Sequence, residues 1–272
     1  MKKIRLALAL VCCMAIATTA QAKEPYPIKV GMAGYSFVRF PGAEGLDYTL
    51  DMLNKLQVQY LCVKDFHLPL NSTDAQIAEF RQKLQAKNII PYGAGPIYMK
   101  SEKEVDNAFE YARKLGVNLI IAVPDYELLQ YVDQKVKEYD MKIAIHLHGP
   151  DLDVYPDAAD VWNHVKNLDP RMGICMDIGH DARAGNDPVK DFQLYHTRIF
   201  DVHIKDVTAS TKQGRSIEIG RGIIDFPALV KVMRKVKYSG VCSLEHEKDM
   251  NDPMIGIAES IGYFKGVLEA VK

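Results

Sequence analysis

Cysteine is scarce in this chain of 272 residues, tryptophan occurs once, and neither sign of charge dominates. Five cysteines are too few for a small disulfide-stabilised domain. A content of 48% hydrophobic and 25% charged residues argues against a disordered or collagen-like chain. The formal net charge of -1 gives no electrostatic reason to expect nucleic acid as a partner. The length suits one large core, either a single α/β barrel or two small domains.

The apolar run over residues 6–17 is too short to cross a bilayer comfortably, which takes roughly 20 residues. Basic residues precede it at positions 2–5, and an Ala-Gln-Ala motif follows at positions 20–22. This arrangement is typical of a cleaved secretory signal peptide. We therefore expect residues 1–22 to be removed and the mature chain to be exported, to the periplasm or the medium, without stable membrane insertion.

Two of the cysteines, Cys12 and Cys13, lie inside the predicted signal peptide. Either is a candidate lipidation site, but Val11 is bulkier than the residue that such sites usually have ahead of the cysteine. The remaining three lie in apolar, strand-like runs, and their odd number does not suggest a disulfide framework. We expect these three to be buried free thiols: Cys62, Cys175 and Cys242.

Short apolar runs rich in β-branched residues alternate with longer amphipathic segments along the rest of the chain. Such runs are typical of buried parallel strands. The predicted strands are 28–33, 59–66, 89–94, 119–123, 142–147, 171–176, 199–205 and 240–245. Between them, 72–87 carries apolar residues at helical spacing, 101–104 has the sequence of a capping box, and Pro227 lies in the first turn of a helix that begins near residue 225.

Strand–helix repeats in this number are typical of a (β/α)₈ barrel, the TIM-barrel fold. The rival is a doubly wound open sheet, which would normally have a glycine-rich phosphate loop after its first strand. Residues 34–37 lack such a loop, and no linker-like stretch interrupts the chain. We therefore predict that 23–272 forms a single α/β domain, a (β/α)₈ TIM barrel.

Side chains that bind metals stand at the ends of the late strands, where the active sites of such barrels lie. They are His146, His148, Asp177, His203 and Glu245. Alternation along a strand places residues two apart on the same side, so Lys205 should accompany His203 and Glu247 should accompany Glu245. Imidazole and carboxylate donors together suit a divalent ion such as Zn²⁺, Mn²⁺ or Co²⁺, with Mg²⁺ as a further candidate.

Several motifs make the sequence resemble the xylose isomerase-like TIM-barrel superfamily, which includes sugar isomerases, epimerases and dehydratases. These are a D-x-x-H element at 177–180, an H-x-K-D element at 203–206, a G-x-G-x-x-D-F element at 220–226, and Glu245 on the eighth strand. The resemblance implies that Asp177, His203 and Glu245 bind one divalent metal ion, with His180 beside the metal or on the substrate.

The fifth strand departs from this family pattern. Many isomerases and epimerases of the superfamily have E-x-H there, whereas this chain has His146-Leu147-His148. His146 can still bind the metal, which makes His146, Asp177, His203 and Glu245 the predicted ligands, although His148 is an alternative to His146. A metal-bound imidazole is not a free base, so the two-carboxylate mechanism of the ketose epimerases is not expected here.

The predicted activity is that of a metal-dependent isomerase or epimerase, which removes the proton next to the carbonyl of a keto-sugar or keto-glycoside. Two alternatives stay open: a lyase that cleaves 3-keto-glycosides by β-elimination at the same metal site, and a non-catalytic sugar-binding barrel. The predicted partner is a small carbohydrate and not nucleic acid, and the oligomeric state stays open.

The predicted catalytic and binding residues surround the metal ligands. The candidate catalytic groups are Glu245, Lys64 and Lys205, of which Lys205 could equally orient the substrate. The candidate substrate contacts are His148, His180, His67, Arg221 and Glu247.

Overall fold

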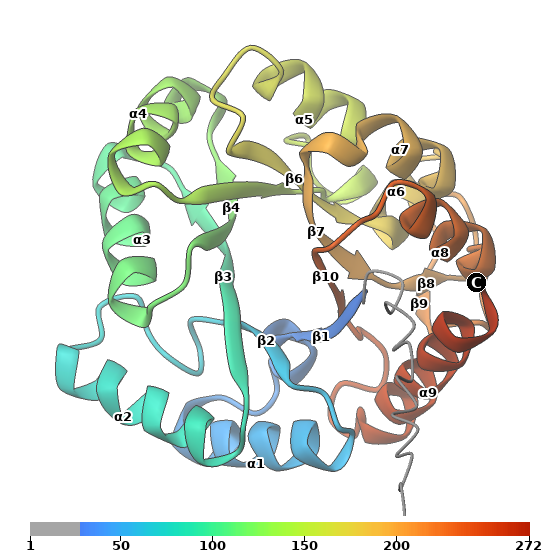
Figure 1. The fold of residues 1–272 in the computed structure, drawn as a ribbon, viewed down its shortest axis with the longest axis horizontal. Coiled ribbons are helices and arrows are strands. Elements are labelled where there is room, and N and C mark those ends of the chain that lie inside the picture. The colour runs from blue at the N-terminus through green and yellow to red at the C-terminus, as the bar shows by residue number, and fades with distance from the viewer. Residues whose placement is uncertain (1–27) are drawn as a thin grey trace, which may run out of the picture.

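The computed structural model describes residues 28–272, and the predicted signal peptide lies outside them. Eight parallel strands close into a barrel in the order β1-β10-β7-β6-β5-β4-β3-β2, which confirms the predicted fold. Figure 1 shows the strands as a central ring with the helices outside it. The strands are β1 (Lys29–Ala33), β2 (Tyr60–Val63), β3 (Ile90–Met99), β4 (Leu119–Pro124), β5 (Lys142–His146), β6 (Met172–Asp177), β7 (Ile199–Ile204) and β10 (Val241–Leu244).

The helices bury their apolar stripes against the outside of the barrel. They are α1 (Gly42–Lys55), α2 (Asp74–Ala86), α3 (Glu102–Leu115), α4 (Leu129–Tyr139), α5 (Ala158–Val165), α6 (Ile178–Arg183), α7 (Pro188–Tyr195), α8 (Phe226–Lys235) and α9 (Met254–Ala270). Single 3₁₀ turns are η1 (Gly34–Phe37), η2 (Tyr126–Leu128), η3 (Gly149–Asp151) and η4 (His196–Arg198). Within residues 28–272, every helix is too short or too polar to cross a membrane.

The reciprocal capping box that was predicted at the start of α3 forms instead at the start of α2. The reciprocal capping box forms at α2, between Thr73 and Gln76. At α3, Ser101 accepts the Glu104 N–H as expected, but the Glu104 carboxylate accepts from the Lys100 N–H at 2.6 Å. The predicted box at 101–104 is therefore only half formed, because the glutamate bonds the residue before the cap.

Two features of the strands were not predicted. β3 continues past residue 94 to Met99, and the short strands β8 (Asp206–Val207) and β9 (Ser216–Ile217) pair antiparallel beside the barrel. A strand of two residues has no hydrophobic period that a sequence pattern could reveal. The three predicted buried thiols are confirmed: Cys62, Cys175 and Cys242 are free and buried.

Candidate metal centre

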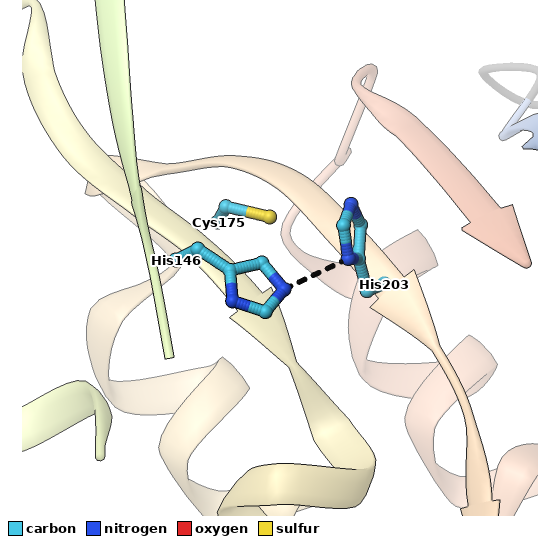
Figure 2. A group of neighbouring side chains, drawn as sticks. All are labelled: His146, Cys175 and His203. Carbon is cyan, nitrogen blue, oxygen red and sulfur yellow. Dashed lines mark hydrogen bonds between the residues drawn. The ribbon is translucent and has the colours of Figure 1, made fainter. Parts of the chain in front are cut away.

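Four predicted donors converge where β5, β6, β7 and β10 end. The ligand atoms of His146, Asp177, His203 and Glu245 all lie within 4.8 Å of one another, and all four side chains are buried. His146 Nε2 lies 3.0 Å from His203 Nδ1 (Figure 2), and His203 Nδ1 lies 3.3 Å from Glu245 Oε2. The register of the sheet causes this, since Asp177 lies beside His203 on the neighbouring strand. The structure thus brings the predicted ligand set together.

Lys205 lies among three carboxylates. Its Nζ is 2.9 Å from Glu245 Oε2, 3.0 Å from Asp177 Oδ2 and 3.2 Å from Glu247 Oε1. The contact with Asp177 is not aligned as a hydrogen bond, so this buried oxygen has no hydrogen-bond partner. Gly179 leaves room for the lysine stem, because a Cβ there would lie 2.8 Å from Lys205 Cγ.

The charge of this cluster fits a divalent cation. With both imidazoles neutral, as ligands would be, three carboxylates and one ammonium group leave a formal excess of two negative charges, and buried charge is costly unless it is paired. Burial lowers the pKa of His146 well below its usual value, and the neighbouring His203 lowers it further. The His146 ring is therefore neutral, as a metal ligand must be. Burial disfavours the charged form of His203, but Cys175, Glu245 and Asp201 raise the pKa of this ring well above its usual value, so it would release a proton when a metal binds. His146, Asp177, His203 and Glu245 are the residues that would hold the ion.

Neighbouring groups fix the orientation of two of these donors. Asp177 caps α6, and its Oδ1 accepts a hydrogen bond from the His180 N–H at 2.8 Å, which leaves Oδ2 facing the centre. Asp201 Oδ2 lies 3.4 Å from His203 Nε2, on the side of the ring away from the other donors. A carboxylate behind a ligating imidazole holds the ring in one orientation. Asp201 was not predicted, although its position two residues before His203 on one strand face was a usable signal.

The position of Glu245 depends on a residue at the other end of the described sequence. Ser36 Oγ donates to the Leu244 carbonyl at 3.1 Å and accepts from the His246 N–H at 2.9 Å. These bonds tie η1 to the backbone on both sides of Glu245. Sequence reasoning missed Ser36, because nothing local relates it to a strand 208 positions away.

Asp206 organises the glycine-containing loop that follows the seventh barrel strand. Its carboxylate accepts backbone N–H groups of Gly220 and Gly222 at 2.9 Å each, and of Ile224 at 3.2 Å. A Cβ at position 222 would lie 2.2 Å from Asp206 Oδ1, so only glycine allows this approach. The last residue of the H-x-K-D element and the glycines at 220 and 222 therefore form one structural unit.

A cavity of about 310 Å³ lies against the donor set. Its lining is Tyr35, Lys64, Pro96, Tyr98, His146, His148, His180, Glu245 and Glu247. Burial lowers the pKa of His148, and burial together with the Lys205 ammonium lowers the pKa of His180 to about 4. Both rings are therefore neutral at neutral pH. The Tyr98 hydroxyl lies 2.8 Å from His148 Nε2.

The acidic residues and lysines around this cavity differ in protonation. Burial raises the pKa of the partly exposed Glu247, the Lys205 ammonium opposes this shift, and the negative charge of Glu245 adds to it. Burial disfavours the Lys205 ammonium, but Asp177, Glu245 and Glu247 together raise its pKa well above the usual value. Lys205 is thus a cation and a hydrogen-bond donor, which favours its predicted role in orienting the substrate over that of a base.

Lys64 lines the cavity, but its ammonium group already has two partners. Lys64 Nζ donates to Asp65 Oδ1 at 2.8 Å and to the Pro96 carbonyl at 3.0 Å. The lysine is therefore placed to contact a substrate, and a role as base would first require it to leave this ion pair.

Two predicted substrate contacts do not line the cavity. His67 is buried, and its Nε2 donates to the Phe40 carbonyl at 2.9 Å. Arg221 forms an exposed two-point ion pair with Glu259 on α9. The His67 imidazole is hydrogen-bonded inside the protein, and the Arg221 guanidinium is paired at the surface. Neither group therefore faces the cavity.

A closed parallel barrel with metal-type donors at the carboxyl ends of its strands defines a TIM barrel with a candidate metal centre. Residues 57–267 match the family model of the xylose isomerase-like TIM barrel. The chain therefore belongs to this family, which confirms the resemblance seen in the motifs.

Known proteins of this kind resemble the chain over different lengths. An inosose dehydratase of Lacticaseibacillus casei is 27% identical over 138 residues, which is 44% of this chain and 45% of the relative. A structure of an uncharacterised protein from Parabacteroides distasonis is 27% identical with a TM-score of 0.67, and covers 88% of this chain and 98% of its own. The structure of an IolI protein with a bound zinc atom is 18% identical with a TM-score of 0.73, and covers 90% and 99%.

Proposed function

We propose that this chain is a divalent-metal-dependent carbohydrate enzyme that removes the proton next to the carbonyl of a keto-sugar or keto-glycoside. One observation carries the proposal: His146, Asp177, His203 and Glu245 converge beside a cavity of about 310 Å³, with excess negative charge around Lys205. A bound divalent cation would polarise the carbonyl and the adjacent hydroxyl, which acidifies the C–H bond between them. Similarity to an inosose dehydratase supports this class of reaction.

Glu247 is the proposed base. Its carboxyl group lines the cavity, and its pKa is raised chiefly by burial, which strengthens it as a proton acceptor. Lys205 lies 3.2 Å from it and donates a hydrogen bond to the oxygen on which negative charge develops. The Tyr98–His148 pair supplies neutral hydrogen-bonding groups that orient the sugar hydroxyls.

We further propose that the reaction ends in β-elimination. Among the residues described, both carboxylates that line the cavity, Glu245 and Glu247, follow β10. Epimerisation by two carboxylates needs a second one across the substrate, and the fifth strand offers neutral imidazoles there. In elimination, Glu247 takes the proton from carbon, the C–O bond to the β-substituent breaks, and Glu247 returns the proton to the departing oxygen. Glu247 would serve isomerisation equally well, which makes an isomerase the second candidate.

A 3-keto-glucoside with a chromogenic aglycone tests the reaction. We expect release of the aglycone together with the unsaturated keto-sugar when Zn²⁺, Mn²⁺ or Co²⁺ is present, and none after chelation. An isomerised sugar that retains its aglycone would show the isomerase instead. Binding of the glycoside without turnover, with every metal supplied, would show a sugar-binding barrel and contradict both enzymatic proposals.

The base is tested by Glu247→Gln, with Asp249→Asn as the control on the same loop. Removal of a general base should lower turnover by about 10²–10⁴-fold. Zinc affinity should stay close to that of the wild type, because Glu247 is not one of the four proposed ligands. Among residues 28–272, the exposed Asp249 forms an ion pair only with Lys248, so its variant should keep full activity. Equal turnover in the two variants would exclude Glu247 as the base.

We also propose that residues 1–22 direct export, so that the enzyme meets extracellular or periplasmic glycosides. The basic start, the apolar run and the Ala-Gln-Ala motif support this. Expression of the full chain in a Gram-negative bacterium, fractionation and N-terminal sequencing test it. A periplasmic protein that begins at Lys23 is expected, and an uncleaved cytoplasmic protein would contradict it.

A further inference from the structure

A buried thiol lies next to the proposed metal ligands and has no role in the function proposed above. Cys175 precedes Asp177 by two residues on β6, so both side chains face the barrel interior. Its Cα is in register with His146 on one neighbouring strand and with Asp201 on the other. The ligand atoms of His146, Cys175 and His203 lie within 4.8 Å of one another, and Figure 2 shows the sulfur pointing toward the two rings. This group shares both imidazoles with the four proposed ligands but does not include the two carboxylates.

The other two thiols of the described chain have different surroundings. Cys62 Sγ lies 3.7 Å from the Gly95 carbonyl, and Cys242 Sγ lies 3.8 Å from Met233 Sδ. Neither belongs to a group of potential metal ligands among residues 28–272, whereas Cys175 does. Each imidazole of this group also has a buried nitrogen without a hydrogen-bond partner, His146 Nδ1 and His203 Nε2.

We propose that Cys175 binds the metal ion together with His146 and His203, and that its thiolate selects zinc over magnesium and manganese. This inference rests on the proposed function, since it names the ion at the same site. Two imidazoles and a thiolate form a donor set that favours Zn²⁺ or Co²⁺, whereas Mg²⁺ and Mn²⁺ prefer oxygen ligands. His146 on the fifth strand supplies a nitrogen ligand where many isomerases and epimerases of the superfamily have a glutamate oxygen, which also favours Zn²⁺ over Mg²⁺.

Asp201 provides a route for the thiol proton. Cys175 Sγ lies 3.6 Å from Asp201 Oδ2, to which it donates a hydrogen bond, and the Tyr92 hydroxyl donates to the same oxygen at 3.2 Å. If the sulfur bound an ion, the S–H bond would break, the Asp201 carboxylate would be the neighbouring acceptor for the proton, and the metal would take the place of the proton on sulfur. No atom changes its oxidation state, and the step needs no other reactant.

Cobalt substitution provides the test, because Co²⁺ bound by a thiolate absorbs strongly in the near ultraviolet while its weaker visible bands report any tetrahedral-like site. The reduced, metal-free full-length protein is titrated with Co²⁺ as wild type, Cys175→Ser, Cys62→Ser and Cys242→Ser. We expect the near-ultraviolet band in the wild type and in the two control variants. Cys175→Ser should lose that band and keep the visible ones, and its preference for Zn²⁺ over Mg²⁺ should fall on the order of tenfold or more.

A measurement on the wild type alone covers the case in which Cys175→Ser does not fold. X-ray absorption at the zinc edge should find a sulfur atom at about 2.3 Å from the metal. A shell of only nitrogen and oxygen, or visible cobalt bands without the near-ultraviolet band, would overturn the thiolate ligand and leave the proposed metal centre standing. If the folded wild type binds neither Co²⁺ nor Zn²⁺, both this inference and the proposed function fail.

Discussion

The two halves of the barrel have the same architecture and different chemistry. The early strands β1 to β4 and the late strands β5, β6, β7 and β10 form one closed ring, and one hydrophobic cluster includes residues from both halves. The early half contributes Tyr35, Lys64, Pro96 and Tyr98 to the cavity lining, whereas every one of the proposed metal ligands belongs to the late half. The fold therefore does not determine where the chemistry lies, since equivalent strand ends carry either residues that line the cavity or potential metal ligands.

The largest effect expected from this comparison is the loss of a donor on the late half. Asp177→Asn removes a negative charge from the centre and keeps the size of the side chain. Zinc affinity by calorimetry and turnover should both fall on the order of 100-fold or more, since outer groups alone account for 10–100-fold at such sites. The matched change on the early half is Tyr98→Phe, which removes the hydroxyl beside His148 and should leave zinc affinity unchanged. A similar loss of zinc affinity in both variants would contradict the division between the halves.

Regular features made most of the fold predictable. Each barrel strand is an apolar run, as in 119–123, and the structure places β4 at Leu119–Pro124. The end of β3 was missed by five residues, because Gly95 and Pro96 usually interrupt strands and here continue one. Short elements such as β8 and β9 depend on neighbours such as Asp206, which a local pattern does not contain.

The candidate site was predictable where polar residues stand in apolar strands. His146, Asp177, His203 and Glu245 have a cost of burial that a common ion offsets, and the structure brings them together. His67 and Arg221 had no such constraint. Their partners, Phe40 and Glu259, come from other elements of the fold, so the sequence alone could not show that these side chains were already engaged.

The two halves also differ in their buried ionisable groups, of which Asp181 on α6 belongs to the late half. Burial and, after it, the nearby Asp191 raise the pKa of Asp181 to about 8. The folded state therefore holds a proton that the unfolded state releases near pH 4, and stability should fall as pH rises from about 4 to about 8. Asp181→Asn removes this dependence. In urea denaturation, the free energy of unfolding of the variant should rise relative to that of the wild type by up to about 1.4 kcal/mol per pH unit over that range.

The control for Asp181 is the exposed Asp153. Asp153→Asn makes the same chemical change at an exposed position and therefore controls for the substitution itself. If Asp181→Asn and Asp153→Asn show the same profile, Asp181 ionises normally in the folded protein and the assigned shift is wrong.

The early half should show a smaller effect of opposite sign at His67. Burial lowers the pKa of this imidazole to about 4, and its bond to the Phe40 carbonyl only partly opposes the shift. The unfolded state binds a proton near pH 6.5, whereas the folded state binds it only near pH 4. The free energy of unfolding therefore decreases as the pH falls from 6.5 to 4.

His67→Gln keeps a donor for the carbonyl and cannot titrate. It should lose about 1 kcal/mol at pH 8, where imperfect hydrogen-bond geometry is its main defect, and recover relative to the wild type between pH 6.5 and 4. Urea denaturation at pH 8, 6 and 4 measures this, with the exposed His164→Gln as control. If the free energies of unfolding of His67→Gln and the wild type differed by the same amount at all three pH values, the pKa of His67 would not be lowered in the folded protein. The opposite pH slopes assigned to the two halves would then not hold.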